Sequence, residues 1–328
     1  VGFLDDVGVA RTLARRTAAR LVVWASKLDP ETELAIRAEG VDLTLIEDGF
    51  LRSVGLGAGL ARGGAYVLDR SGIYYDASRP SDIEIALETA NLRQEEIVRA
   101  AALLAAIRKA RLSKYNVGGR HPVAWPAGRE RVVVVGQVAV DAGVRRTQSA
   151  TLDVAAADTV NRDLLAAARA EHPCAFIVYK PHPDVAAGLR PGAVAEADTR
   201  RLADAVTGVA DIVDLIEGAD RLVTLSSLSG FEALVRGKAV TVHGLPFYAG
   251  WGLTDDRTRS PRRTRQRTLD ELAAIALIDY SRYVDPARRM PCTAETMVAA
   301  LARLKADPMH RALSDVRRRV SWLGRKLG

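Results

Sequence analysis

The segment VVVVGQVAVD at residues 132–141 is the strongest indication of the fold class in this sequence. Four consecutive valines leave no polar face, which is typical of a central strand in a parallel sheet covered on both sides. Gly136 and Gln137 end the run and begin a loop in which Asp141 is the only carboxylate. Ligands of open α/β sheets bind at the carboxyl ends of the strands. We therefore predict a parallel sheet whose carboxyl edge faces a ligand.

Segments on both sides of this strand predict two α/β units. The second half alternates helical and strand-like segments at residues 161–170, 175–179, 213–217 and 221–225. The first half does the same at residues 9–20, 21–24, 31–39 and 43–46, and long helices follow within residues 81–111. Prolines and a glycine at residues 121–130 indicate a linker. We predict the GT-B architecture of two Rossmann-like lobes facing a central cleft, with lobes at residues 1–125 and 126–290 and a helical tail at residues 291–328.

The composition is that of an ordinary globular protein, with 48% hydrophobic and 27% charged residues among 328. No run approaches the ~18 apolar residues of a membrane-spanning helix. Cys174 and Cys292 lie far apart and belong to no metal-ligand spacing, which favours a reducing, cytoplasmic setting. Because the chain starts at Val1 without a signal peptide, we expect a piece of a longer protein.

The formal net charge of +7 has its excess late in the chain. The basic residues concerned are Arg257, Arg259, Arg262, Arg263, Arg265, Arg267, Arg317, Arg318, Arg319, Arg325 and Lys326. Anionic small ligands or an anionic membrane surface explain this clustering at least as well as nucleic acid does. The tail from about residue 295 favours packing across the base of the lobes, although Trp322 beside Arg325 and Lys326 also fits a membrane interface.

A hydroxyl-rich helix start at residues 225–234 predicts a phosphate site. Ser226, Ser227 and Ser229 precede Gly230, so their hydroxyls and the free N–H groups of the first helical turn converge. Ordinary helix capping by Ser226 or Ser229 explains the serines about equally well. Glu232 on the same turn could accept hydrogen bonds from a ribose, and a helix-dipole interaction is its alternative.

The loop after this helix combines glycines with aromatic residues. It contains Gly244, Phe247, Tyr248, Gly250, Trp251 and Gly252. Glycines let the backbone approach a ligand closely while aromatic faces wall it in. A packed turn is the alternative, but such a loop is costly unless it has a function.

Two strand ends carry charged groups suited to chemistry. Glu47 follows the strand at residues 43–46 and could act as acid or base, although a surface turn with an ion pair to Arg52 is slightly favoured. Asp141 could act as nucleophile or base, although capping of the next helix is the more common role. Because each of the acidic pairs at residues 47–48 and 255–256 is adjacent in sequence, their side chains point apart, and we expect no obligatory divalent metal.

The motif YKPHPD at residues 179–184 is more specific. Pro181 and Pro183 fix the backbone of His182 directly after a strand, which indicates a side chain held for presentation. His182 can donate to a phosphate, and Lys180 supplies a positive charge nearby. A structural histidine satisfied by backbone is the alternative.

Together these segments resemble the KpsC-type capsule polysaccharide β-Kdo transferases, through nearly the whole chain. The resemblance is carried by EDGFLRSVGLGA (47–58), LDRSGIYYDASRPSD (68–82), LSKYN (112–116), GQV with Asp141, VYKPHPDV (178–185), TLSSLSGFEAL (224–234), GLPFYAGWGLTDD (244–256) and RYVDP (282–286). The sequences of these motifs are more similar to the carboxy-terminal module of such enzymes, which is associated with transfer to the 7-hydroxyl of Kdo.

The resemblance implies a retaining GT-B transferase that takes Kdo, a ketose with its own carboxylate, from CMP-β-Kdo. The first lobe would then face a Kdo-terminated glycolipid acceptor, and the second would bind the CMP-sugar. It also implies a peripheral position at the cytoplasmic face of the inner membrane, a possible second transferase module in the full-length protein, and no nucleic-acid partner. A monophosphate leaving group needs cations and N–H donors but no diphosphate-bound metal.

The resemblance further implies roles for individual residues. Asp141 would be the nucleophile of a double displacement and Glu47 the acid/base for the acceptor. His182 and Lys180 would neutralise the departing phosphate, while Glu232 would hold the ribose. The donor site would also contain Gln137, Ser226, Ser227, Ser229 and Gly230, and the sugar would contact Arg52, Tyr248, Trp251 and Gly252.

One departure from the family pattern concerns the nucleophile loop. The related module carries two adjacent acids, where this chain has Val140 and Asp141. Asp141 aligns with the second acid, so we expect catalysis to survive. A transferase for another CMP-activated acidic ketose, such as a sialic-type sugar, and a catalytically silent module that binds nucleotide or anionic glycolipid are the alternatives.

Overall fold

The valine strand is the centre of a six-stranded parallel sheet. A computed structural model of the chain describes residues 2–55, 61, 63–117 and 123–310. The strand order of this second sheet is β6-β5-β4-β7-β8-β9, and every neighbouring pair is parallel. Its strands are β4 (Arg131–Val135), β5 (Phe176–Lys180), β6 (Ala205–Val206), β7 (Arg221–Thr224), β8 (Ala239–Val242) and β9 (Asp255–Asp256). The four valines of β4 are buried, as predicted.

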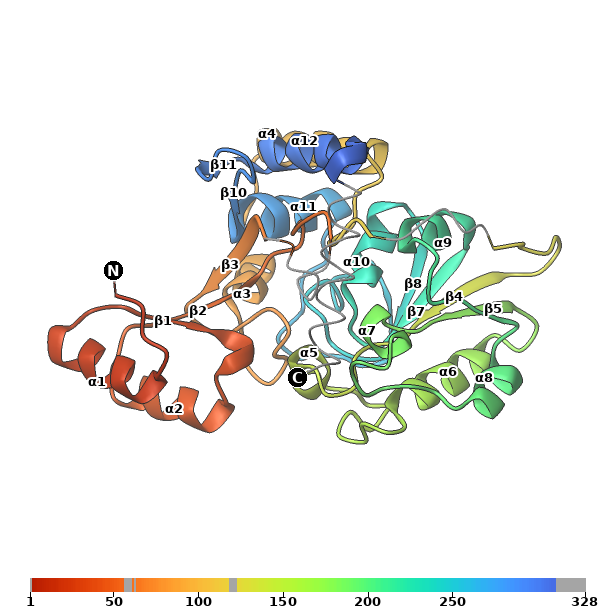
Figure 1. Cartoon of the computed structure of the whole chain (residues 1–328), viewed down its shortest axis with the longest axis horizontal. Coiled ribbons are helices and arrows are strands. Elements are labelled where there is room, and N and C mark those ends of the chain that lie inside the picture. The colour runs from red at the N-terminus through yellow and green to blue at the C-terminus, as the bar shows by residue number, and fades with distance from the viewer. Residues whose placement is uncertain (1, 56–60, 62, 118–122, 311–328) are drawn as a thin grey trace.

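A smaller, mixed sheet forms the other half of the molecule (Figure 1). Its order is β1-β2-β3-β10-β11, in which β1 and β2 are parallel and the remaining neighbours are antiparallel. Its strands are β1 (Leu21–Trp24), β2 (Leu43–Asp48), β3 (Ala65–Asp69), β10 (Ser281–Val284) and β11 (Pro291–Cys292). The expected α/β class with parallel strands is confirmed, and the sequence analysis missed β3 and the last two strands.

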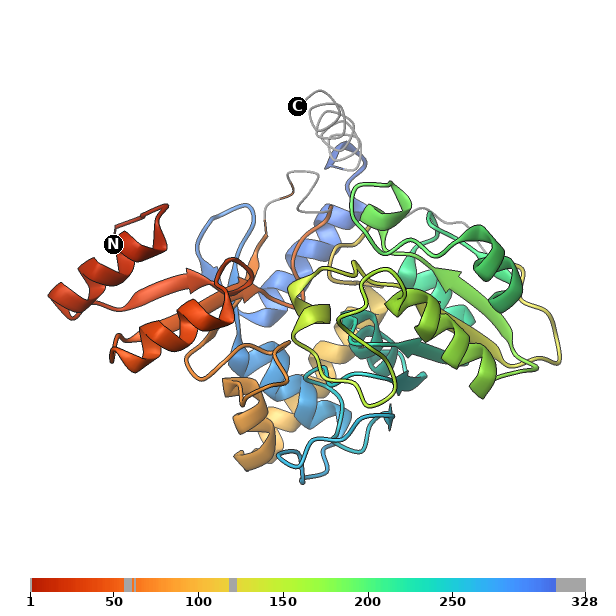
Figure 2. The same ribbon diagram turned by 90° about the horizontal axis from the view of Figure 1, so that it is seen from below.

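Helices cover both sheets. Those of the second sheet are α5 (Ala142–Arg145), α6 (Val160–Glu171), α7 (Pro183–Ala186), α8 (Glu196–Leu202), α9 (Ile212–Gly218) and α10 (Leu228–Val235). The first sheet has α1 (Val7–Thr17), α2 (Pro30–Ala38), α3 (Asp82–Thr89), α4 (Gln94–Lys109), α11 (Leu269–Ala273) and α12 (Ala294–Ala306). Helices α1 and α2 pack around β1 and β2, at the end of the molecule away from the second sheet (Figure 2).

The starts of these helices follow local sequence signals. Asp29 caps α2 by accepting a hydrogen bond from the Thr32 N–H at 2.8 Å, and Pro30 occupies the first helical position. Ser81 caps α3 in the same way through the Glu84 N–H. Such caps satisfy N–H groups that have no partner within the helix.

The chain returns to the first sheet after completing the second, so the predicted lobe boundary at residue 290 is wrong. Strand β10 pairs antiparallel with β3, and the Tyr280 hydroxyl donates to Asp69 at 2.8 Å across 211 residues of sequence. Helix α11 packs against α4. The segment is held by contacts that are distant in sequence, and its own pattern is too short to reveal them.

The beginning of the tail packs on the first half of the molecule, and packing across the base of both lobes stays a prediction. Helix α12 contacts α4 and β10, and Arg99 on α4 pairs with Glu295 at 2.7 Å. Trp322, Arg325, Lys326 and the arginines at 317–319 lie outside the described residues. No helix among the described residues is long and apolar enough to cross a membrane.

A buried histidine after β8 predicts acid sensitivity of the fold. His243 is 1% exposed, its Nδ1 lies 2.9 Å from the Thr151 hydroxyl, and its Nε2 has no hydrogen-bond partner. Burial lowers the pKa of His243 below the ordinary 6.5, although Glu171 opposes this. The unfolded chain therefore takes up the proton first as pH falls, and stability decreases below about pH 6.5.

We expect this group to lower the unfolding free energy by about 1.4 kcal/mol for each unit of pKa difference. Urea denaturation between pH 7.5 and 5 measures the loss. In His243→Asn, which keeps a polar group towards Thr151, the slope of stability against pH should be shallower. An unchanged slope in this variant would contradict the assignment.

Candidate functional site

Asp141 lies at the carboxyl edge of the second sheet, and its side chain makes no capping hydrogen bond to the helix that follows. It occupies the N-cap position of α5, but only its backbone carbonyl serves the helix, accepting from the Val144 and Arg145 N–H groups at 3.0 Å. The carboxylate is 61% exposed, and its nearest cation is Arg190 at 3.8 Å. The capping alternative is therefore wrong for this side chain. Helix α5 lies between the two sheets (Figure 1).

Glu47 is the penultimate residue of β2 in the first sheet and is buried rather than part of a surface turn. Its carboxylate accepts from the Ser26 N–H at 3.1 Å and from its neighbour's backbone N–H at 3.0 Å. The ion pair expected between Glu47 and Arg52 is wrong, because Arg52 pairs with Asp48 at 2.6 Å. Arg52 also donates to the Ala61 carbonyl, so it stabilises its own loop.

Tyr75 connects the surroundings of the two carboxylates, and the sequence analysis missed it. Its hydroxyl donates to Glu47 at 3.4 Å. Gly143 on α5 packs beside it, since a Cβ there would lie 3.8 Å from the Tyr75 Cβ and 4.0 Å from Asp141. Burial raises the pKa of Tyr75, and the charges of Glu47 and Asp141 raise it further. The two carboxylates therefore share one neighbourhood.

His182 and Lys180 lie at the same edge of the sheet, on the neighbouring strand. Lys180 ends β5 next to Val135, and its ammonium donates to the Ala210 carbonyl at 2.8 Å. Burial lowers the pKa of Lys180 and that of His182, which keeps the imidazole neutral. Because Nδ1 of His182 accepts from the Asp184 N–H at 3.2 Å, its proton resides on Nε2. The structure thus leaves His182 with one N–H donor, and Asp141 is close enough to favour its charged form.

Gln137 and Ser226 join three loops at this edge. The Gln137 side chain accepts from the Ser226 N–H at 2.8 Å and donates to its hydroxyl at 3.3 Å. The Ser226 hydroxyl in turn donates to the Gly143 carbonyl at 3.1 Å. Ser227 caps α10 by accepting from the Ser229 N–H at 3.2 Å, so a serine does cap the helix, but it is neither Ser226 nor Ser229. These contacts fix the loops around Asp141.

The aromatic loop is packed in the core, so the placement of Tyr248 and Trp251 on a sugar-facing wall is wrong. Both side chains are 0% exposed. The Tyr248 hydroxyl donates to the Ser227 carbonyl, and the Trp251 indole donates to the Phe247 carbonyl at 2.7 Å. Of this loop, Gly252 is exposed, with a φ of +81° that favours glycine. Its contact with sugar stays a prediction.

Glu232 connects the two halves of the molecule. It is buried on α10 and accepts from the Lys114 backbone N–H at 2.7 Å. Burial raises the pKa of Glu232, and this hydrogen bond opposes the change. One oxygen of the Glu232 carboxylate is therefore already hydrogen-bonded within the protein. That Glu232 binds the ribose of the nucleotide stays a prediction.

Gly230 is required by packing against Tyr248. A Cβ at residue 230 would lie 2.2 Å from the Tyr248 hydroxyl and 2.7 Å from the ring carbon that bears it. We expect Gly230→Ala to lower the unfolding free energy by about 1–3 kcal/mol, as overpacking does, in urea denaturation. Gly143→Ala, where a Cβ meets only ordinary contacts, is the matched control. Equal stability of the two variants would contradict this role for Gly230.

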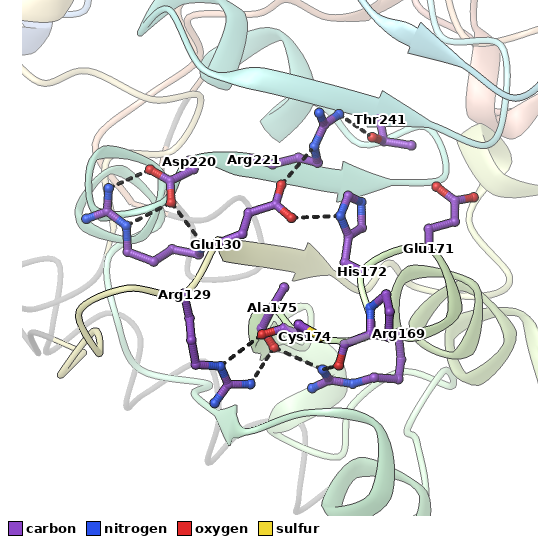
Figure 3. Close-up of polar contacts among 12 residues, drawn as sticks. Arg129, Glu130, Arg169, Glu171, His172, Cys174, Ala175, Asp220, Arg221 and Thr241 are labelled. Carbon is purple, nitrogen blue, oxygen red and sulfur yellow. Dashed lines mark hydrogen bonds and ion pairs between the residues drawn. The ribbon is translucent and has the colours of Figure 1, made fainter.

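Many basic residues are neutralised inside the protein. Figure 3 shows such a network at the amino edge of the second sheet, where Glu130 contacts His172 at 2.9 Å and Arg221 at 3.4 Å. The cluster that follows β9 behaves likewise, with partners at Glu171 for Arg257, Glu84 for Arg262 and Arg263, Asn91 for Arg265, and Glu271 for Arg267. These five arginines therefore stabilise the fold, whereas Arg259 of the same cluster is exposed, so most of the cluster does not form a surface for anions.

Among the described residues, no group of three or more His, Cys, Asp or Glu side chains could hold a metal ion. The polar groups at the carboxyl edge consist of carboxylates, cations and N–H donors. Such a set suits an anionic ligand with a reactive centre beside Asp141.

The fold and the site define a mixed α/β protein whose polar residues gather at the carboxyl edge of a parallel sheet. The chain belongs to the family of capsule polysaccharide biosynthesis proteins, which matches it over residues 21–283.

Among curated proteins, the capsule polysaccharide modification protein LipA of Neisseria meningitidis serogroup B is 39% identical over 88% of this chain and 40% of its own length. The lipopolysaccharide-processing protein LpsZ of Rhizobium meliloti is 40% identical over 84% of this chain and 62% of its own length. The chain thus spans less than half the length of LipA and just under two thirds of the length of LpsZ.

Two solved structures of KpsC from Thermosulfurimonas dismutans are similar in fold. The beta Kdo 2,4 transferase is 36% identical with a TM-score of 0.76, over 87% of this chain and 86% of that chain. The beta Kdo 2,7 transferase is 33% identical with a TM-score of 0.75, over 92% and 91%. The resemblance to KpsC-type proteins is confirmed. The two likenesses are nearly equal, so they do not single out the 2,7-type module that the motifs favoured.

Proposed function

We propose that the chain is a retaining Kdo transferase of GT-B architecture that uses CMP-β-Kdo as donor. The observation that carries the proposal is the pair of carboxylates, Glu47 and Asp141, which come from different sheets and share Tyr75 as neighbour. Similarity to the KpsC transferases supports Kdo as the sugar.

In this proposal, Asp141 attacks the anomeric carbon of Kdo as the bond to the CMP phosphate breaks. His182 donates its Nε2–H to the departing phosphate, and Lys180 and the loops at Ser226 surround the same edge. Glu47 then accepts the proton of the acceptor hydroxyl, whose oxygen attacks the same carbon and releases Asp141. Two inversions give net retention.

Arg190 joins the donor site in this proposal, although no motif singled it out. Its guanidinium lies 3.8 Å from Asp141 and is 43% exposed. The following residue, Pro191, accepts from the Ala139 N–H at 3.1 Å, which holds this turn against the nucleophile loop. A guanidinium there can bind the carboxylate of the sugar as a bidentate partner.

The acceptor and the cellular location follow from the same family resemblance. We propose a Kdo-terminated glycolipid as acceptor, a peripheral position at the cytoplasmic face of the inner membrane, and no obligatory metal. A second transferase module in the natural protein fits the longer relatives. Because Val140 replaces an acid of the related module, a catalytically silent binding module is the alternative that the experiment must distinguish.

The test incubates the chain with CMP-Kdo, or in parallel with a CMP-sialic-type donor, and synthetic Kdo-terminated acceptors that offer the 4- or the 7-hydroxyl, with or without EDTA. Calorimetry measures CMP binding. Mass spectrometry detects transfer, and NMR of the anomeric centre gives its configuration. We expect a β-linked product, formed in the same yield with and without EDTA. Transfer only from a CMP-sialic-type donor would favour the other ketose, CMP binding without any transfer would favour the silent module, and a strict magnesium requirement would refute the metal-free site.

A further inference from the structure

Arg146, five residues after Asp141, connects the nucleophile helix to the first half of the molecule. It is the C-cap residue of α5, and its N–H donates to the Ala142 carbonyl at 2.9 Å. Its own carbonyl accepts from the Ala77 N–H at 3.1 Å, so the backbone already bridges the two halves. Its side chain is 11% exposed and points into the first half.

Three segments of the first half hold the Arg146 guanidinium. It donates to the Leu28 carbonyl, which lies 118 residues away in sequence. It pairs with Asp76 at 3.5 Å, and the fully buried Glu33 on α2 lies 3.9 Å from it. Nη2 is hydrogen-bonded to Leu28, whereas Nη1 has no hydrogen-bond partner and is held by the two ion pairs alone. Because an unpaired buried N–H is costly, the position of Nη1 depends on these two carboxylates.

The same contacts lead from Arg146 to Glu47. Asp76 follows Tyr75, and the Tyr75 hydroxyl donates to Glu47. The Asp76 carboxylate also accepts from the Ser78 N–H and hydroxyl, at 3.0 and 2.6 Å, which fixes the conformation of this loop. A continuous chain of contacts therefore runs from Glu47 through residues 75–77 and Arg146 to the helix that Asp141 begins.

We propose that Arg146 is a positioning residue that sets the distance between Asp141 and Glu47 across the cleft. The proposal rests on the proposed function for its catalytic consequence. Donor cleavage uses groups at the edge of the second sheet, whereas transfer to the acceptor also needs Glu47. Loss of Arg146 should therefore slow the second step more than the first, because a small misplacement of reacting groups costs up to about 100-fold in rate.

The test compares Arg146→Met with Arg145→Ala, which removes the same charge from the exposed neighbouring residue. Release of CMP without acceptor and formation of glycan product are measured in parallel. We expect Arg146→Met to reduce product formation about 10- to 100-fold, with CMP release within about threefold of wild type. Arg146→Lys, which keeps the charge without the bidentate fork, should lie between. An equal loss of both activities would overturn the proposal.

The double variant Arg146→Met/Asp76→Asn distinguishes a loss of positioning from a loss of folding stability. It removes the carboxylate left unpaired by the single change, while the asparagine oxygen still accepts from Ser78. We expect thermal stability to recover and the imbalance between CMP release and transfer to persist. Recovery of transfer together with stability would show that Arg146 is only structural.

Hydrogen exchange gives a readout that needs no activity. Peptides covering residues 73–78 and 141–147 should exchange faster in Arg146→Met than in Arg145→Ala. The Ala77 N–H donates to the Arg146 backbone carbonyl, and the guanidinium contacts that hold this residue in place are lost in Arg146→Met. Unchanged exchange would overturn the positioning role. A wild-type chain without any transfer would refute the proposed function, and exchange would still decide the role of Arg146.

Discussion

Asp141→Ala should abolish sugar transfer, by roughly 10³-fold or more, while CMP still binds. Asp141 has no capping role for its side chain, and its carboxylate is exposed beside Arg190. Its removal therefore takes away the attacking group without removing a contact that holds α5. Transfer is measured with CMP-Kdo and acceptor by mass spectrometry, and CMP affinity by calorimetry.

Asp141→Asn is the matched control for shape. It keeps the size of the side chain but loses the nucleophilic charge, so it should be as inactive as the alanine variant. Exposed Asp153→Asn, in the same half of the molecule, should retain full activity. Transfer near the wild-type rate in either Asp141 variant would contradict the nucleophile assignment.

Glu47→Gln should uncouple the two half-reactions. A phosphate leaving group needs little help from an acid, whereas the acceptor hydroxyl needs a base, so only the second step should lose about 10²–10⁴-fold. The chain should then release one equivalent of CMP in a burst and accumulate a glycosyl adduct. Intact-protein mass spectrometry detects the added mass, and fragmentation should place it on Asp141.

The Glu47 variant needs a control for its buried hydrogen bonds. Ser26 and Tyr75 donate to the same Glu47 oxygen, so a glutamine that keeps its oxygen there serves both, and the Asp48 N–H loses its acceptor. Tyr75→Phe removes only the hydroxyl that donates to Glu47, and should keep most of the activity. If Glu47→Gln turned over at the wild-type rate without an adduct, Glu47 would not be the base.

The sequence predicted the elements that local pattern controls. The valine run gave a central strand because four apolar residues in a row fit a site buried on both faces. The motif around His182 gave a histidine fixed by two prolines, and the structure shows its Nδ1 held and its Nε2 free to donate. Spacing along one strand and its loop was enough for these predictions.

The sequence misled where burial decided the outcome. Tyr248 and Trp251 lie among glycines, a composition equally compatible with a ligand wall and a packed turn. The structure buries both rings and explains Gly230 by the approach of Tyr248 rather than by a phosphate. Composition cannot distinguish these cases, because the glycine and its neighbour meet only after the chain folds back.

Local sequence was sufficient to predict a parallel sheet with Asp141, Lys180 and His182 at its carboxyl edge, since a strand and the loop after it are continuous in the chain. The folded chain was needed to show that Tyr75 and Arg146 connect the surroundings of Glu47 and Asp141, and that β10 returns to the first sheet. These features depend on contacts between residues 28 to 211 positions apart, and no local periodicity records such pairs.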